Sequence, residues 1–282
     1  MPRPVLVVFI LCVGIQLSAD TGDDIRILFT SNSNGKYENC QCPDYPHGAL
    51  ERRAAFIGQY KEQYPKTIVL DNGDNFFHGM RAAEKTLVTR IFSLIPYDII
   101  NVGDQDLAFG TEAYRALPEI IEAGDPPVSL WRDKTEISVL TVTHPTTIRF
   151  YPEDTFAEVP FNDPIRRIEQ WVSDIAGEKV LSVLLSHSGY EWDVEYAHRF
   201  PEITLIIGGH SQTLIDTVNK INGVAVQQAG GNAEYIGEII CTLVGDHFRI
   251  KSYQLYPMDE AVGAHPEVDK WLDEYHQTYQ RK

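Results

Sequence analysis

The sequence predicts a layered α/β fold with helices outside a sheet. Short apolar runs rich in β-branched residues alternate along the chain with longer stretches whose apolar positions recur at helical spacing. This alternation is typical of strands joined by crossover helices. The predicted buried strands are 25–30, 67–70, 99–102, 180–185 and 204–207. The predicted helices between them are 50–64, 82–94, 112–123 and 164–175.

Further segments complete the prediction. Residues 137–142 and 147–151 resemble a hairpin or an extension of the sheet. Residues 224–228, 235–243 and 247–255 are predicted to form a meander that closes a second sheet, and 266–280 a terminal helix. No Gly/Ser-rich or charge-rich linker divides the chain, so we expect residues 20–282 to form one domain.

Composition narrows the classes of partner. The chain has 282 residues, 43% of them hydrophobic, which is enough to bury a large core and argues against disorder. Its formal net charge is −16, whereas nucleic acids and anionic membranes attract basic surfaces. We therefore expect no nucleic-acid partner, and small ligands, metal ions or proteins instead.

The first nineteen residues resemble a secretory signal peptide. Arg3 precedes a nearly continuous apolar run from Val5 to Leu17. This run is too short to span a bilayer, because a spanning helix needs roughly 20 residues. Ser18 and Ala19 then provide a small-residue cleavage site. A buried N-terminal strand and an uncleaved anchor are the alternatives. We expect a secreted or periplasmic protein with no membrane span after removal of residues 1–19.

Polar side chains follow the predicted strands. Ligands of open α/β sheets bind outside the carboxyl ends of the strands, so these segments are expected to converge on one crevice. Carboxylates, imidazoles and amides recur in them, often beside a glycine that lets backbone approach closely. The segments are Ser31–Gly35, Asp71–Phe76, Gly103–Asp106, Ser186–Gly189 and Gly208–Gln212.

This ordered series resembles the calcineurin-like metallophosphoesterase superfamily, and within it the N-terminal catalytic domain of secreted 5′-nucleotidases and UDP-sugar hydrolases. The resemblance runs from about residue 25 to about residue 240. It implies an α/β/β/α sandwich of two mixed sheets flanked by helices, without the C-terminal domain that grips the nucleoside in those nucleotidases. The matching segments are 27–35, 48–57, 73–76, 103–110, 186–189, 209–212 and 228–237.

The same resemblance implies a metal site. Asp74, Asp104, His187 and His210 match ligand positions and together offer two carboxylates and two imidazoles, a set suited to Zn, Mn or Fe. A second, weaker subsite beside Asp74 is implied at positions where the family has acidic or imidazole ligands. Here those positions hold the amides Asn32, Asn34 and Gln212.

The expected catalytic histidine is also replaced. Gln105 stands in its position and donates hydrogen bonds but cannot give up a proton, a role typically worth about 10²–10⁴-fold in rate. Asp106 is a candidate substitute. We therefore expect a phosphoester hydrolase that acts on a small phosphorylated molecule with reduced or altered activity. A metal- or redox-handling protein and a catalytically silent binding module are the alternatives.

Two cysteines follow the first altered motif. Cys40 and Cys42 form a Cys-Gln-Cys unit, which can be a pair of metal-binding thiolates, a redox pair or a short disulfide. Cys241, by contrast, lies in an apolar run and is predicted to be core packing.

If Cys40 and Cys42 supply metal ligands, the Cys40→Ser/Cys42→Ser variant should lose metal. Elemental analysis of the purified protein and of this variant measures that loss. Unchanged metal content would remove the two thiols from the set of ligands.

Overall fold

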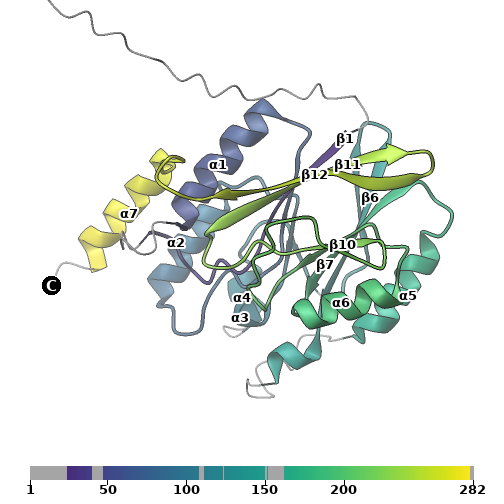
Figure 1. Ribbon diagram of the computed structural model, residues 1–282. Coiled ribbons are helices and arrows are strands. Elements are labelled where there is room, and N and C mark those ends of the chain that lie inside the picture. The colour runs from purple at the N-terminus through teal and green to yellow at the C-terminus, as the bar shows by residue number, and fades with distance from the viewer. Residues whose placement is uncertain are drawn as a thin grey trace, which may run out of the picture.

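The computed structural model describes residues 24–39, 47–107, 111–122, 124–149, 151 and 162–279, and these form four layers. Two six-stranded sheets pack face to face, and helices cover the outer face of each (Figure 1). The predicted α/β/β/α sandwich of two mixed sheets is therefore confirmed.

The first sheet has the strand order β12-β11-β1-β2-β3-β4. Strands β1 to β4 are parallel to one another, while β11 and β12 form an antiparallel hairpin that pairs with β1. The strands are β1 (Asp24–Thr30), β2 (Ile68–Asp71), β3 (Ile99–Asn101), β4 (Ile120–Ile121), β11 (Tyr235–Val244) and β12 (His247–Pro257).

The second sheet has the order β5-β6-β7-β8-β10-β9. Its four central strands are parallel, and the edge strands β5 and β9 are antiparallel to their neighbours. The strands are β5 (Val128–Arg132), β6 (Thr135–Thr143), β7 (Val180–His187), β8 (Leu205–Gly208), β9 (Lys220–Ile221) and β10 (Val224–Gln227).

Alternate side chains of the strands divide the core between two interfaces. In β1, Ile27 and Phe29 face the other sheet, whereas Leu28 faces the helices, as the two-residue period of a strand requires. In β7, Leu185 lies in the core between the sheets and Leu184 packs on the opposite side. Apolar burial on both faces explains why these strands appear in the sequence as continuous hydrophobic runs.

Helices α1 (Leu50–Gln63), α2 (Ala82–Phe92) and α7 (Pro266–Tyr279) cover the first sheet, and α5 (Pro164–Asp174) and α6 (Tyr190–Arg199) cover the second (Figure 1). Shorter helices stand at strand ends. They are α3 (Asp104–Leu107), α4 (Thr111–Tyr114) and the 3-10 helix η1 (Pro145–Ile148).

Two predicted elements are wrong because of proline. The helix expected over 112–123 ends at Tyr114, since Pro118 cannot continue it, and Ile120–Ile121 instead form strand β4 beside β3. The strand expected over 147–151 is replaced by η1, in which Pro145 occupies the first turn and the His144 side chain caps the Thr146 amide.

The predicted meander is also wrong in its connections. Strand β10 joins the second sheet beside β8, whereas β11 and β12 complete the first sheet beside β1. A close packing explains the β1–β11 pairing, because a Cβ atom at Gly237 would lie only 2.1 Å from the ring of Phe29. Cys241 on β11 is fully buried, as predicted, and burial raises the pKa of its thiol to about 12.

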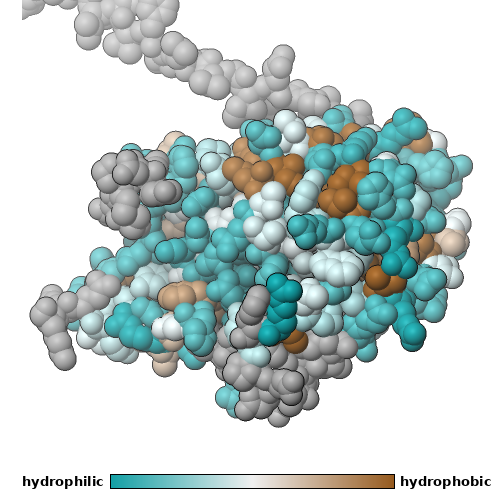
Figure 2. Space-filling model, turned by 60° about the horizontal axis from the view of Figure 1, so that its bottom comes forward, coloured by the Kyte–Doolittle hydropathy of each residue, from teal (hydrophilic) through white to brown (hydrophobic). Residues whose placement is uncertain are grey.

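Among the described residues, six large apolar side chains are exposed: Phe77, Trp131, Leu214, Val218, Val244 and Tyr279. On the face drawn in Figure 2, hydrophilic residues predominate and hydrophobic ones form small separate groups. Across the described ranges, no helix combines the length and the apolarity that crossing a bilayer requires.

Two buried amides join the sheets at the carboxyl ends of their strands. Asn72, directly after β2, donates hydrogen bonds from Nδ2 to the carbonyl oxygens of Ser186 and Ile207 in the second sheet, at 2.8 and 2.9 Å. Asn101, at the end of β3, donates to Asn72 Oδ1 at 2.8 Å. Both side chains are fully buried. This cross-link sets the spacing of the two sheets at one edge.

The Asn72→Ala variant should lower the free energy of unfolding by about 2–3 kcal/mol, because buried hydrogen-bonding groups lose their partners. Denaturant titration measures the change. The Gln170→Ala variant, at an exposed position of α5, is the control and should stay within about 0.5 kcal/mol of the parent. Equal effects of the two substitutions would contradict the structural role of Asn72.

Candidate metal centre

Four side chains from both sheets converge at the edge that Asn72 and Asn101 hold together. Asp74 follows β2, Asp104 begins α3 after β3, His187 ends β7, and His210 follows β8. One potential ligand atom from each lies within 4.8 Å of every other. Atoms bound to one ion at about 2.2 Å lie at most about 4.4 Å apart, so a small inward movement suffices for a common ion.

Contacts within the cluster show how close the groups are. Asp104 Oδ1 lies 3.0 Å from His187 Nε2 and 2.7 Å from His210 Nδ1. His187 Nε2 is also 3.3 Å from Asp74 Oδ1. Asp74, Asp104 and His187 are buried, while the His210 side chain is 37% exposed and gives the cluster access to solvent.

The tautomer of His187 suits a metal ligand. Its Nδ1 lies 2.7 Å from the carbonyl oxygen of Asn72, which can only accept a hydrogen bond. Nδ1 therefore carries a proton, and Nε2, which faces the two carboxylates, is the nitrogen that could bind a metal once its own proton is lost. An imidazole that donates its other N–H to a carbonyl is the usual arrangement of a metal-binding histidine.

Electrostatics also favour a cation here. Burial alone would lower the pKa of His187, but the charges of Asp74 and Asp104 raise it well above its usual range. Burial likewise opposes ionisation of Asp104, yet hydrogen bonds from His187 and His210 hold its pKa below the usual range. Without a metal, the proton on His187 thus offsets part of the carboxylate charge, and a divalent ion would displace it.

Backbone strain is concentrated around the cluster. Non-glycine residues with positive φ are uncommon and gather at functional sites. Here Asp74 has a φ of 58° and His210 a φ of 66°. The other such residues next to the site are Asn32, Asn34, Gln212, Asn232 and Ala233.

Gly103 allows the close approach of these loops. A Cβ atom at this position would lie 2.3 Å from both the amide nitrogen and Oδ1 of Asp74, and 2.8 Å from the ring of His187. Any side chain at this position would push Asp74 and His187 apart, so the close approach of the loops requires a glycine at position 103.

The residues predicted for a second subsite form a network of amides instead. Gln105 Nε2 donates to Asn34 Oδ1 at 2.8 Å and to Asp74 Oδ2 at 3.1 Å. Asn34 Nδ2 in turn donates to Gln212 Oε1 at 3.2 Å and to Asn232 Oδ1 at 3.1 Å. We call Asn34, Gln105, Gln212 and Asn232 the amide cluster.

The Asn32 side chain connects two loops through hydrogen bonds. Its Nδ2 donates to the carbonyl oxygen of Gly230 at 3.0 Å, and its Oδ1 accepts from the backbone amide of His210 at 3.0 Å. Both ends of this amide are therefore engaged with backbone groups.

Asp106 is likewise engaged by the backbone. Its two carboxylate oxygens accept from the amides of Gly103, Asp74, Asn75 and Phe76 at 2.6–3.0 Å. Burial and then the charge of Asp74 raise its pKa, while these N–H groups oppose the shift. A fully buried carboxylate with both oxygens occupied holds the loops after β2 and β3 in place.

Sequence patterns did not single out three contributors to the site. They are Asn72, which orients His187; Tyr151, whose hydroxyl donates to Asp104 Oδ2 at 3.0 Å; and Asn232 of the amide cluster. Asn72 and Asn232 had a visible signal, their places in the segments 71–76 and 228–237. Cys40 and Cys42 lie outside the described residues.

A buried arginine lies next to the site. Arg53 belongs to helix α1, and its side chain is fully buried. It donates to Ser33 Oγ at 2.6 Å and lies 3.7 Å from Asp71 Oδ2. Arg53 therefore supports the strand ends beneath the metal cluster.

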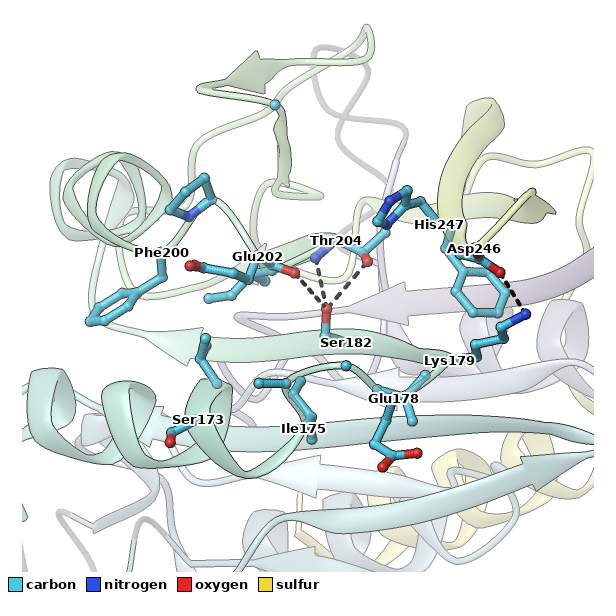
Figure 3. Close-up of a pocket in the computed structure, with 18 of the residues that line it drawn as sticks. Ser173, Ile175, Glu178, Lys179, Ser182, Phe200, Glu202, Thr204, Asp246 and His247 are labelled. Atoms are coloured by element: carbon cyan, nitrogen blue, oxygen red, sulfur yellow. Dashed lines mark hydrogen bonds and ion pairs between the residues drawn. The ribbon is translucent and has the colours of Figure 1, made fainter.

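A large cavity lies away from the metal cluster. It has a volume of about 1210 Å³ and opens between the ends of α5 and α6, the start of β7 and the β11–β12 turn (Figure 3). Ser182 in its wall accepts from the Thr204 amide at 2.9 Å, and Lys179 pairs with Asp246 (Figure 3). The cavity includes Val180, at the opposite end of β7 from His187, roughly 23 Å away at about 3.3 Å per residue. None of the metal cluster lines it.

Two curated proteins of Bacillus subtilis (strain 168) share sequence similarity with the chain. An uncharacterized metallophosphoesterase, YunD, is 27% identical over 138 residues, which are 48% of this chain and 30% of that protein. The trifunctional nucleotide phosphoesterase protein YfkN is 28% identical over 127 residues, or 42% of this chain and 8% of that protein. The chain thus matches less than a third of either relative. No protein-family model matches it.

Solved structures share the fold. A 5′-nucleotidase precursor from Thermus thermophilus has a TM-score of 0.77 at 19% identity, covering 91% of this chain and 59% of that one. The sulfate thiohydrolase SoxB of the same species has a TM-score of 0.79 at 18% identity, with 92% and 61% covered. The calcineurin-like phosphoesterase YfkN of Bacillus subtilis has 0.71 at 18%, with 92% and 99% covered. The predicted resemblance to calcineurin-like metallophosphoesterases and 5′-nucleotidases is therefore confirmed, as is their fold.

The Asp104→Asn variant should lose the response of the protein to metal. With Zn²⁺ or Mn²⁺ at about 100 times its dissociation constant, we expect the melting temperature of the parent to rise by about 5–10 °C. The variant, with one charged ligand removed, should shift by less than half of that. Asp273→Asn, on the exposed face of α7, is the matched control. An undiminished shift in Asp104→Asn would place the ion elsewhere.

Proposed function

We propose that this chain is a metal-dependent phosphoester hydrolase with one divalent ion held by Asp74, Asp104, His187 and His210. The observation that carries the proposal is the meeting of these four ligand atoms within 4.8 Å, from loops widely separated in sequence. Two carboxylates and two imidazoles suit Zn, Mn or Fe.

A bound divalent ion would lower the pKa of a water molecule and polarise a phosphoryl oxygen. In the hydrolysis, the water oxygen bonds to phosphorus, the bond from phosphorus to the leaving oxygen breaks, and that oxygen takes up a proton. The protein orients the ligands: the Asn72 carbonyl holds the ring of His187, and Tyr151 holds Asp104. The exposed edge of His210 leaves a path for a small substrate.

Proton transfer to the leaving oxygen is the step that these side chains support least. Gln105, in the position of the expected catalytic histidine, has no ionisable proton and is bound to Asn34 and Asp74. Asp106 has both oxygens occupied by backbone amides. We therefore propose slow hydrolysis of a small phosphorylated molecule. The apolar run before Ala19 supports action in a secreted or periplasmic setting.

The amide cluster also favours a second candidate, a binding module without turnover. In that case the metal centre would hold a phosphorylated ligand without cleaving it. Hydrolysis of p-nitrophenyl phosphate with Zn, Mn or Fe added distinguishes the two functions. Release of nitrophenol that disappears in Asp104→Asn supports the hydrolase, and its absence in metal-loaded protein supports the binding module.

The Gln105→His variant should raise kcat/KM for phenyl phosphate by about 10- to 100-fold, because phenolate is a poor leaving group and an imidazole can supply the proton that an amide cannot. Initial rates at saturating metal measure the change. Gln170→His, on the exposed surface of α5, is the control and should leave the rate unchanged. An unaltered rate in folded, metal-loaded Gln105→His protein would count against the assigned role of position 105.

A further inference from the structure

The amino group of Gln105 lies where a second cation would bind. It is 2.8 Å from Asn34 Oδ1 and 3.1 Å from Asp74 Oδ2, so its two N–H bonds serve two oxygens that an ion could otherwise share. The other oxygen of Asp74, Oδ1, lies 3.3 Å from His187 Nε2 and would be the one to hold an ion at the metal cluster. A neutral NH₂ group thus occupies the second oxygen of the Asp74 carboxylate.

The orientation of every amide in the cluster follows from Asp74. A carboxylate only accepts hydrogen bonds, so Gln105 must present its NH₂ to Asp74 Oδ2. The same NH₂ requires that Asn34 present its oxygen. Asn34 then turns its own NH₂ toward the oxygens of Gln212 and Asn232. The network is consistent from end to end, which is unlike a metal site that has merely lost ligands.

The charge of the site determines which ligand it favours. The carboxylates of Asp74 and Asp104 offer two negative charges, which one divalent ion neutralises. A second divalent ion would leave the site with two positive charges, which suits the dianion of a phosphomonoester. The amide cluster supplies partial charges only. An approaching dianion therefore gains much less here than in a site with two ions.

We propose, on the basis of the hydrolase function proposed above, that the amide cluster replaces the second metal ion and that the site selects phosphodiesters. A phosphodiester carries one negative charge. Its non-bridging oxygens need one metal ion and a hydrogen-bond donor. The centre would supply the ion. The NH₂ group of Gln212 would supply the donor, because it donates to no other described residue, whereas the NH₂ groups of Gln105 and Asn34 are engaged.

A cavity beside the amide cluster offers room for an ester group. It has a volume of about 500 Å³, and Gly35 and Asn232, which is a member of the amide cluster, are among the residues that line it. Tyr37, His47 and Phe77 are among the described residues that line it, and the Phe77 side chain is 40% exposed. A diester brings two organic groups, so this partly aromatic cavity can hold one of them.

Two measurements on the unaltered protein test the proposal. Elemental analysis after dialysis should find one divalent ion per chain. At about pH 8, where a monoester is fully dianionic because its second pKa is about 6, kcat/KM for methyl p-nitrophenyl phosphate should exceed that for p-nitrophenyl phosphate by about 10-fold or more. Two ions per chain, or a preference for the monoester, would overturn the inference.

Rebuilding the second subsite should reverse the preference. In Asn34→His/Gln105→Ala/Gln212→His, two imidazoles face Asp74 and the NH₂ group is gone. Positions 34 and 212 have φ of 49° and 52°, a region in which histidine is enriched. We expect two ions per chain and at least a 10-fold shift of the kcat/KM ratio toward the monoester. Asn222→His, at an exposed turn with the same φ of 49°, is the matched control.

The results separate this inference from the proposed function. One ion with hydrolysis that favours the monoester contradicts the inference alone. No ion at the centre and no hydrolysis of either ester contradict the hydrolase itself. If one ion binds without turnover, calorimetric titration with dimethyl phosphate and methyl phosphate decides the charge preference. Tighter binding of dimethyl phosphate then supports the inference, and tighter binding of methyl phosphate contradicts it.

Discussion

The hydrogen bonds of Asn72 to the carbonyls of Ser186 and Ile207 connect two sheets whose facing side chains are largely apolar. Hydrophobic packing is non-directional and leaves the relative position of the layers loosely specified. A buried amide with two carbonyl partners removes that freedom at one edge. Because the Asn72 carbonyl also orients His187, the element that fixes the sheets also fixes a candidate ligand.

The metal cluster is assembled from both sheets for the same reason. Two of its members follow strands of the first sheet and two follow strands of the second. Parallel strands bring their carboxyl ends to one edge, so the four loops share one crevice although more than 130 residues separate Asp74 from His210. Positive φ at both ends of that set shows that packing, rather than local preference, holds the loops.

The amide cluster changes the chemistry of this edge without changing its shape. Asn34, Gln105 and Gln212 are linked to one another by hydrogen bonds. Neutral side chains attract a second cation less than charged ones would, and in the proposed site Gln105 takes the place of that cation. The sandwich is common to the chain and its structural neighbours, whereas these amides set the charge of this edge.

Periodicity predicted most buried strands and the longer helices, because apolar side chains repeat with the period of the element that buries them. It did not predict the effect of Pro118, which ends a helical pattern, or of Pro145, which starts a 3-10 turn. Edge strands β5 and β9 were missed because half-exposed or very short strands carry little apolar signal.

The residues of the candidate site likewise fall into those that the sequence predicted and those that only the tertiary structure revealed. The sequence by itself determined the strand-end position of Asp74, Asp104, His187 and His210, and the replacement of ionisable groups by Asn34, Gln105 and Gln212. Only the tertiary structure decided that β10 joins β8, that Asp106 binds backbone amides and that Asn232 and Tyr151 reach the centre. These contacts join residues far apart along the chain, and local patterns carry no record of such pairings.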